Sequence, residues 1–425
     1  MTSTVYPSLP TGTVKAISSK SVAHRLLICA AFADKKTVIR CDQTNRDIDA
    51  TVACLSALGA VIVRKAPFFE VTPVSPINIR KNAVLPCGES GSTLRFLLPI
   101  VAALGADSSF IMEGRLPMRP LSPLRELLEA NGIELSAAGS NPLSVKGKLL
   151  GRDFSIAGNI SSQFISGMLL ALSLLPHSSK LSVTGKTESA PYINITLDAL
   201  SVFGAAPERQ GNSYMIAANQ VFISPQSIEV EGDWSNAAFP LCLGVLGKGS
   251  VTVTDLNTYS SQGDMKIIEL IKLFGGKIIP APDGKGYIAT SSALCGIDID
   301  AAQTPDLVPI LATLASVAKG QTRIYGAERL RLKESDRLES VRDMLSSLGA
   351  DIQVTDTGLI INGKSHLKGG RVNSYNDHRI AMSAAVAATV CDEAVIIDGA
   401  ECVSKSYPSF WQDMISLNIK LSRNE

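Results

Sequence analysis

One pattern, a helix closed by a small turn residue and followed by a short apolar strand, recurs six times along this 425-residue chain. Gly and Asn accept the left-handed backbone conformation that closes a helix. The six turn residues lie 73, 72, 71, 74 and 69 positions apart: Gly59, Gly132, Gly204, Gly275, Gly349 and Asn418. We therefore predict six helix ends at these positions and a repeat of about 71 residues.

A second set of predicted helices, rich in small residues, alternates with the first and keeps the same period. Its landmarks lie 69, 73, 71, 73 and 71 positions apart: Ser19, Gly88, Ser161, Gly232, Pro305 and Asn376. Short β-branched runs between the helices predict strands, at Val61–Val63, Ile228–Val230, Val251–Val253, Ile278–Ile279 and Val395–Ile397. Six such repeats could form an array, a ring or two groups of three, because 425 residues exceed one compact core.

The two sets of helices differ in polarity. The second set is apolar almost all round after its first turn, which predicts burial, whereas the first set keeps a charged face and should contact solvent. We expect inner helices, then a sheet, then outer helices. Polar residues at the N-termini of the buried helices would then converge on one surface.

Composition limits the partners. The net charge of +1 argues against a polynucleotide or an anionic membrane as the main partner, while a local cluster could still bind a small anion. No apolar run approaches the roughly 18–20 residues of a membrane span, and the N-terminus lacks a signal-peptide pattern. Eight scattered cysteines without a CxxC pair predict buried, reduced thiols in a cytoplasmic protein. The four histidines lack metal-ligand spacing, so we expect no metal site.

Charged and hydroxyl side chains gather near predicted helix starts, where free N–H groups and the helix dipole favour anions. Lys20, Ser21 and Arg25 open the helix within Ser18–Ala31, and a glycine turn at Gly88–Arg95 opens another. Taken singly, each motif also fits a capped helix with solvated cations. Together the recurring cations suggest a substrate with more than one anionic group: Lys20, Arg25, Arg95, Arg119, Lys333, Arg337, Arg379 and Lys405.

Two segments carry more specific expectations. Arg329, Arg331 and Lys333 alternate with leucines, so an extended segment would place three cations on one face. Glu334 follows among cations, either as a positioned proton carrier or as an ion-pair partner. Thr304–Asp306 is a typical helix opening, and Pro120 marks a further predicted helix start after Arg119.

At this level of detail the chain resembles a known family. SSKSVAHRLL, LPMRPL, SSQF, SAPYINITL, TPD, RLKESDRL, YNDHRIAM and SKSYPSF occur in the order found in 5-enolpyruvylshikimate-3-phosphate synthases. The resemblance implies an α/β (α+β) fold: a two-domain inside-out α/β barrel of six βαβαββ-type repeats, three per domain, joined by a two-stranded hinge. One domain would be residues 18–230 and the other residues 1–17 plus 231–425, with a cleft that closes on substrate.

The resemblance also implies the reaction: transfer of the enolpyruvyl group of phosphoenolpyruvate to the 5-hydroxyl of shikimate 3-phosphate, with release of phosphate and without a cofactor or metal. From composition and charge we expect a cytoplasmic protein that binds neither nucleic acid nor membranes, and we expect it to be a monomer. The catalytic residues would be Asp306, Glu334 and Lys20. The shikimate 3-phosphate contacts would be Lys20, Ser21, Arg25, Ser161, Ser162, Gln163, Ser189, Asp306 and Lys333. The phosphoenolpyruvate contacts would be Lys20, Gly91, Arg119, Gln163, Arg337, Arg379 and Lys405.

The chain departs from the family pattern at two places. It has Glu89-Ser90-Gly91-Ser92 where many members have Asn-Ala-Gly-Thr, and Arg329 where many have Asn. Two alternative functions remain at this point. One is enolpyruvyl transfer to UDP-N-acetylglucosamine, whose family typically carries a cysteine in a Gly-rich loop near the position of Arg119, whereas this chain has none between Cys87 and Cys242. The other is a non-catalytic repeat protein that binds polyanions.

Overall fold

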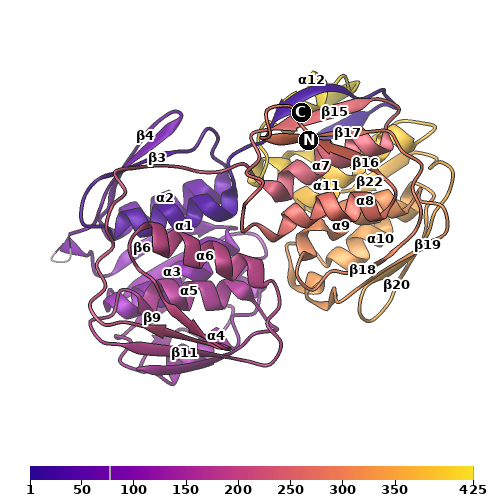
Figure 1. Ribbon diagram of the computed structural model, residues 1–425. Coiled ribbons are helices and arrows are strands. Elements are labelled where there is room, and N and C mark those ends of the chain that lie inside the picture. The colour runs from indigo at the N-terminus through magenta and orange to yellow at the C-terminus, as the bar shows by residue number, and fades with distance from the viewer. Residues whose placement is uncertain (76–77, 425) are drawn as a thin grey trace. The chain divides into compact units, whose positions relative to one another are not determined.

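The computed structural model describes residues 1–75 and 78–424, which form two compact units. We call Ser18–Val230 the central unit, and Met1–Ile17 together with Glu231–Glu425 the terminal unit. Each unit has its own hydrophobic core. Figure 1 traces the chain through both units.

The described helices of the central unit are α1 (Lys20–Ala31), α2 (Arg46–Leu58), α3 (Gly91–Leu104), η2 (Leu116–Met118, a 3-10 helix), α4 (Leu124–Glu129), α5 (Ser162–Leu172) and α6 (Ala190–Val202). Its strands are β3 (Thr37–Arg40), β4 (Val61–Lys65), β5 (Phe68–Thr72), β6 (Ala83–Gly88), β7 (Ser108–Met112), β8 (Glu134–Leu135), β9 (Leu143–Lys146), β10 (Asp153–Ala157), β11 (Ser179–Thr184), β12 (Glu208–Gln210), β13 (Ser213–Ile216) and β14 (Ser227–Glu229).

The α-helices of the terminal unit are α7 (Trp234–Leu246), α8 (Ile267–Leu273), α9 (Val308–Ala315), α10 (Arg337–Ser347), α11 (His378–Ala387) and α12 (Phe410–Ser416). Its 3-10 helices are η3 (Gly263–Lys266), η4 (Pro305–Leu307), η5 (Glu328–Leu332), η6 (Ala388–Val390) and η7 (Ala400–Lys405). Its strands are β1 (Thr2–Val5), β2 (Thr11–Lys15), β15 (Ser250–Thr254), β16 (Lys277–Pro280), β17 (Gly286–Thr290), β18 (Asp298–Asp300), β19 (Gln321–Tyr325), β20 (Asp351–Val354), β21 (Leu359–Asn362), β22 (Gly370–Asn373), β23 (Val395–Asp398) and β24 (Leu421–Asn424).

Each unit contains three four-stranded sheets with one pairing pattern: a parallel pair followed by two antiparallel pairs. The central unit has the strand orders β14-β3-β5-β4, β6-β7-β9-β8 and β10-β11-β13-β12. The terminal unit has β2-β15-β17-β16, β18-β19-β21-β20 and β22-β23-β1-β24. The predicted α/β fold of six βαβαββ-type repeats, three in each group, is confirmed.

Two strands show how the chain passes between the units. Strand β2 precedes α1 in sequence, yet it pairs with β15 in the terminal unit. Strand β14 precedes α7 in sequence, yet it pairs with β3 in the central unit. The N-terminal segment therefore completes a sheet of the terminal unit, and the last strand of the central unit completes a sheet with its first strand. The chain passes from one unit to the other twice, after Ile17 and after Val230.

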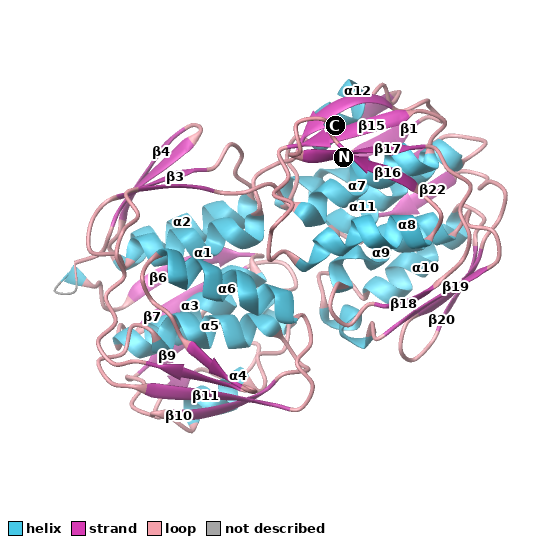
Figure 2. Ribbon diagram, viewed as in Figure 1, coloured by secondary structure: helices cyan, strands magenta, loops and turns pink. Residues whose placement is uncertain are grey.

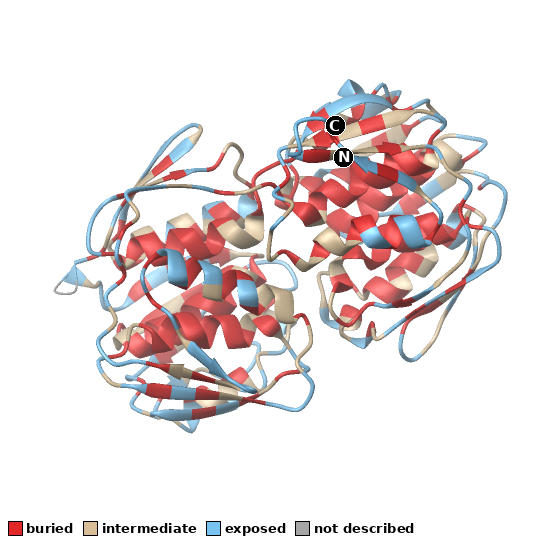
Figure 3. Cartoon of the chain, in the orientation of Figure 1, coloured by how far each residue is buried: buried red, intermediate tan, exposed pale blue. Residues whose placement is uncertain are grey.

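The burial expected from helix polarity is confirmed. Helices of the apolar set, such as α3 and α5, are buried along nearly their whole length, whereas α10 buries one face (Figure 3). Figure 2 shows helices in the interior of each unit and strands at its margins. The expected sheet between two helix layers is wrong for the central unit, because α1 contacts α2 and α6 directly.

Local backbone predictions had mixed outcomes. All six predicted helix-ending residues adopt positive φ, from 64° at Asn418 to 116° at Gly59. The expected extended segment at 329–333 is wrong, because residues 328–332 form the 3-10 helix η5. In this conformation Arg331 forms ion pairs with Asp336 and Glu339. The helix start expected at Pro120 is also wrong, since α4 begins at Leu124. Seven cysteines are buried as predicted, and Cys295 is exposed.

Candidate active site

The first cluster of predicted residues lies at the start of α1 in the central unit. Lys20 is the first residue of α1, and its Nζ lies 2.9 Å from Oδ2 of Asp47, in the first turn of α2. Both side chains are 17% exposed, so this ion pair sits at the edge of the protein and can still be reached by a ligand. Ser21 follows on the first turn of α1 and is half-buried.

Arg25, one turn further along α1, is a buried cation held by uncharged groups. Its guanidinium donates to Thr196 Oγ1 at 2.6 Å, to the carbonyls of Ser21 and Tyr192 at 2.7 and 2.9 Å, and to Ser166. It also stacks over the ring of Phe96. Among the described residues no carboxylate forms an ion pair with Arg25, and burial lowers its pKa to about 10. An uncompensated buried cation of this kind favours a nearby anion.

The start of α3 brings a second group of predicted residues together. Ser90 caps α3, and Gly91 is its first residue. A Cβ placed on Gly91 would lie 2.8 Å from Nη1 of Arg95 and 2.9 Å from Nη1 of Arg119, so both guanidinium groups approach the glycine backbone. Arg95 also donates to Oε1 of Gln163 at 2.8 Å. Two arginines beside the N–H groups of a helix start form an arrangement that suits a phosphate or carboxylate.

The remaining predicted residues of the central unit lie at the starts of α5 and α6. Ser161 caps α5 by accepting from the N–H of Gln163, and Ser162 is buried. Gln163 also donates to Ser92 of α3 at 2.9 Å, which ties the two helix starts. Ser189 precedes α6, is buried, and holds the left-handed conformation with φ of 52°.

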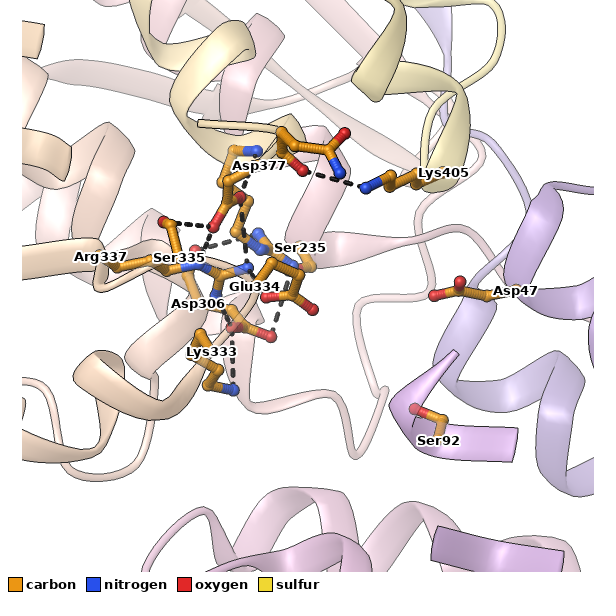
Figure 4. Close-up of polar contacts among 12 residues, drawn as sticks. Asp47, Ser92, Ser235, Asp306, Lys333, Glu334, Ser335, Arg337, Asp377 and Lys405 are labelled. Carbon is orange, nitrogen blue, oxygen red and sulfur yellow. Dashed lines mark hydrogen bonds and ion pairs between the residues drawn. The ribbon is translucent and has the colours of Figure 1, made fainter. Parts of the chain in front are cut away.

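The terminal unit contains a dense ionic cluster around Asp306, shown in Figure 4. Asp306 lies in η4, and its Oδ1 accepts from Arg337 Nη1 at 2.7 Å and from Lys333 Nζ at 3.4 Å. Arg379 approaches Oδ2 at 3.4 Å and donates to the Asp306 carbonyl at 2.9 Å. Three cations from different elements therefore surround one carboxylate that is 17% exposed.

Arg337 is the buried centre of this cluster. Besides Asp306, it donates to Glu334 Oε2 at 2.6 Å and to Asp377 Oδ2 at 2.8 Å. Arg337 is 2% exposed and Asp377 is 0% exposed. The three carboxylates outweigh the effect of burial and raise the pKa of Arg337, whereas burial lowers the pKa of Lys333.

The last two predicted cations lie near α11. Arg379, in the first turn of α11, donates to Ser235 Oγ at 2.6 Å. Lys405 ends η7 and donates to the carbonyl of Asn376 at 3.1 Å (Figure 4). Asn376 and its neighbour Tyr375 both adopt positive φ, so the backbone turns sharply before Asp377.

Reasoning from sequence missed three residues of these clusters, Asp47, Ser235 and Asp377, and it counted Arg95 among the recurring cations without assigning it a substrate contact. Arg95 and Asp377 belong to motifs already singled out, so their position at a helix start was the available signal. Asp47 and Ser235 lie in the first turns of α2 and α7 and carried no distinct motif. A cavity of about 340 Å³ between η2 and β9 includes Arg119 but none of the other predicted site residues, so it does not mark this site.

Two further searches bear on the site. In the part of the chain that the structure describes, no three or more His, Cys, Asp or Glu side chains are arranged to hold a metal ion. Within the same residues, no helix combines the length and apolar character that crossing a bilayer requires.

Known proteins resemble this chain over nearly its whole length. The profile of the EPSP synthase (3-phosphoshikimate 1-carboxyvinyltransferase) family matches residues 7–414. The 3-phosphoshikimate 1-carboxyvinyltransferase of Clostridium kluyveri is 42% identical over 418 residues, covering 97% of this chain and 96% of that protein. The protein of the same name from Clostridium acetobutylicum is 41% identical over 418 residues, with the same coverage.

Solved structures agree with these relatives. A structure of EPSP synthase from Acinetobacter baumannii has a TM-score of 0.82 and 25% identity, covering 99% of this chain and 100% of that one. The enolpyruvyl transferase NikO from Streptomyces tendae shares the fold, with a TM-score of 0.80 and 17% identity over 100% of this chain and 98% of its own. By profile, sequence identity and fold together, the chain belongs to the EPSP synthase (3-phosphoshikimate 1-carboxyvinyltransferase) family.

Proposed function

We propose that this chain transfers the enolpyruvyl group of phosphoenolpyruvate to the 5-hydroxyl of shikimate 3-phosphate, in the shikimate pathway to chorismate and the aromatic amino acids. The full-length relatives named for this reaction, at 41–42% identity, support the proposal. The reaction adds the hydroxyl oxygen to C2 of phosphoenolpyruvate and a proton to C3, and then eliminates phosphate and a proton. No atom changes its net oxidation state, so the proposed chemistry requires no redox cofactor.

Asp306 is the proposed base that takes the proton of the 5-hydroxyl. Its position supports this role, because Arg337 fixes one carboxylate oxygen at 2.7 Å while the side chain keeps an exposed edge. Lys333 and Arg379 add positive charge beside it, which would stabilise an anionic substrate and the charge that develops in a tetrahedral adduct.

Glu334 and Lys20 are the proposed carriers of the proton at C3. Glu334 is held by Arg337 at 2.6 Å and is 29% exposed, so it can reach a ligand. Lys20 is bound to Asp47 in the structure, and an anionic substrate would compete with that carboxylate for its ammonium group. Of the residues proposed for proton transfer, Asp306 and Glu334 lie in the terminal unit, and Lys20 lies in the central unit.

The proposed phosphoenolpyruvate contacts carry the positive charge that a phosphate and a carboxylate need. The convergence of Arg95 and Arg119 on Gly91 supports an anion subsite at the start of α3. The full proposed set is Lys20, Gly91, Arg119, Gln163, Arg337, Arg379 and Lys405.

The proposed shikimate 3-phosphate contacts are rich in hydroxyl groups, which match a polyol. Arg25 supports the assignment, because it is a buried cation without a paired carboxylate among the described residues. The full proposed set is Lys20, Ser21, Arg25, Ser161, Ser162, Gln163, Ser189, Asp306 and Lys333.

We also propose that the protein is a cytoplasmic monomer that acts on small molecules. The near-zero net charge supports small-molecule substrates over a polyanion.

The single observation that carries the proposal is the full-length match to 3-phosphoshikimate 1-carboxyvinyltransferases, with the charged clusters at the expected motifs. Mass spectrometry of a reaction with both substrates tests it directly. We expect one product heavier than shikimate 3-phosphate by an enolpyruvyl group, formed only with active protein. Absence of that product, with both substrates intact, would contradict the proposal.

A further inference from the structure

Four buried polar side chains form a line through the central unit. His24 of α1 bonds through Nδ1 to Thr51 Oγ1 of α2 at 2.7 Å, and Thr51 bonds to Thr93 Oγ1 of α3 at 2.7 Å. Thr93 then bonds to Ser90 Oγ, the cap of α3, at 2.7 Å. All four residues are at most 1% exposed. The line therefore links three helices and ends beside Gly91.

The direction of these hydrogen bonds follows from the proton count of each group. Thr93 Oγ1 donates to Ser90 Oγ, and its longer alternative, the carbonyl of Asp47 at 3.4 Å, also uses Thr93 as the donor. The single hydroxyl proton of Thr93 is therefore already donated, so Thr51 must be the donor in the hydrogen bond between Thr51 and Thr93. Thr51 then has no proton for His24, and Nδ1 of His24 must be the donor.

The surroundings of His24 agree with this assignment. Its Nε2 is buried without a hydrogen-bond partner among the described residues. A proton there would be an unsatisfied buried donor, which is costly, so the neutral Nδ1–H tautomer is favoured. Burial, Lys20 and Arg25 also lower the pKa of His24 well below its usual value, which keeps the ring neutral.

We propose that His24 and Thr51 are positioning residues that fix the first turn of α3, and through it the phosphoenolpyruvate subsite at Gly91. This inference rests on the proposed function. Two bonds to one Ser90 oxygen, from Thr93 N at 3.3 Å and from Thr93 Oγ1, hold that turn. Because Arg95 and Arg119 lie against Gly91, a shift of the turn displaces the groups that meet the anion.

The line of hydrogen bonds also connects to Lys20, another proposed phosphoenolpyruvate contact, through Asp47. Thr93 lies 3.4 Å from the carbonyl of Asp47, the residue whose carboxylate holds Lys20. A directed chain of buried hydrogen bonds strengthens its members cooperatively, so one missing link loosens the whole line. The first turns of α2 and α3 would then lose their shared support.

A matched pair at Thr51 tests the inference by steady-state kinetics. Thr51→Val keeps the shape but removes the hydroxyl, and we expect it to raise KM for phosphoenolpyruvate about tenfold, with kcat and KM for shikimate 3-phosphate within about twofold. Thr51→Ser keeps the hydroxyl and should restore KM. Equal KM values for phosphoenolpyruvate in wild type and Thr51→Val would overturn the inference, as would a loss that Thr51→Ser does not restore.

A measurement on the wild-type protein tests the proton direction without reference to activity. With 15N-labelled histidine, we expect the His24 ring nitrogens to show the Nδ1–H tautomer, unchanged between pH 6 and pH 8. An Nε2–H tautomer or an imidazolium would overturn the inference. If wild-type protein formed no product from the two substrates, the proposed function would fail, while this spectrum would still decide the proton direction.

Discussion

Arg337 Nη1 lies 2.7 Å from Oδ1 of Asp306, although 31 positions separate the two residues in sequence. The same guanidinium reaches Glu334 and Asp377, so one buried cation orients both carboxylates proposed for proton transfer. The geometry of the proposed active-site residues in the terminal unit therefore depends on a group that is itself only 2% exposed.

Removing either proposed proton carrier should abolish most of the turnover while the fold survives. We expect Asp306→Asn or Glu334→Gln to lower kcat by about 100- to 10,000-fold, the range typical of general acid–base groups. Glu339→Gln is the matched control, because Glu339 is a half-buried carboxylate on helix α10 that pairs with Arg331 rather than with Arg337, and its kcat should stay within about twofold. Unchanged kcat in both Asp306→Asn and Glu334→Gln would refute the assigned roles.

Truncating Arg337 should destabilise the protein as well as inactivate it. Arg337→Met leaves Asp377 buried without its main counter-charge, and breaking a buried pair from one side costs about 3–5 kcal/mol. Urea unfolding measures this loss. Adding Asp377→Asn to Arg337→Met should recover part of the stability, because the unpaired buried charge is removed. A double variant less stable than the single one would contradict this account.

A methyl group at Gly91 should weaken phosphoenolpyruvate binding more than it weakens the fold. Gly91→Ala places its Cβ under 3 Å from both guanidinium groups, and these flexible side chains would move to accommodate it. We expect KM for phosphoenolpyruvate to rise about tenfold or more, with KM for shikimate 3-phosphate little changed. An unchanged melting temperature would verify that the loss is local, and an unchanged KM for phosphoenolpyruvate would exclude an anion subsite there.

The buried His24 should make stability fall in mild acid. Burial lowers the pKa of His24 in the folded state, and the positive charges of Lys20 and Arg25 lower it further. Below about pH 6.5 the unfolded chain therefore binds a proton at His24 that the folded chain does not bind. Stability attributable to His24 is therefore present above pH 6.5 and is lost as the pH falls below it.

The pH effect is measured against His24→Asn, which keeps a hydrogen-bond donor but does not titrate. Between pH 7 and pH 5.5 we expect wild type to lose about 1 kcal/mol more unfolding free energy than the variant. Carboxylate titrations affect both proteins alike and cancel in this comparison. Equal losses would mean that His24 accepts a proton in the folded state.

The sequence was most informative where a physical requirement repeats. Six turn residues predicted six left-handed helix ends because few residue types accept that conformation, and Asn418 takes it just as the glycines do. Ser161 was placed at a helix start by the same repeat, and it caps α5 because its short hydroxyl side chain accepts from a helix N–H group.

Alternation of residue types was a weaker guide. Leu330 and Leu332 alternate with cations and suggested a strand, but Leu330 is buried within η5 while Leu332 is 49% exposed. Five residues are too few to separate a period of two from a 3-10 turn. Proline positions also misled, since α4 begins at Leu124, four residues after the helix start predicted at Pro120.

Long-range partnerships could not be read from one sequence. Asp377 pairs with Arg337 across 40 positions, and Arg25 bonds to Thr196 across 171. Such pairs depend on how the repeats close against one another, and local propensity holds no information about that. The line from His24 to Ser90 is another example, because each member taken alone fits an ordinary core residue or a helix cap.

The central claim is tested most directly by phosphate release from phosphoenolpyruvate with shikimate 3-phosphate and, in parallel, with UDP-N-acetylglucosamine. We predict steady release with shikimate 3-phosphate only, and its loss in Asp306→Asn. Release with UDP-N-acetylglucosamine alone would assign the sister reaction, and release with neither acceptor would contradict the enolpyruvyl-transfer account.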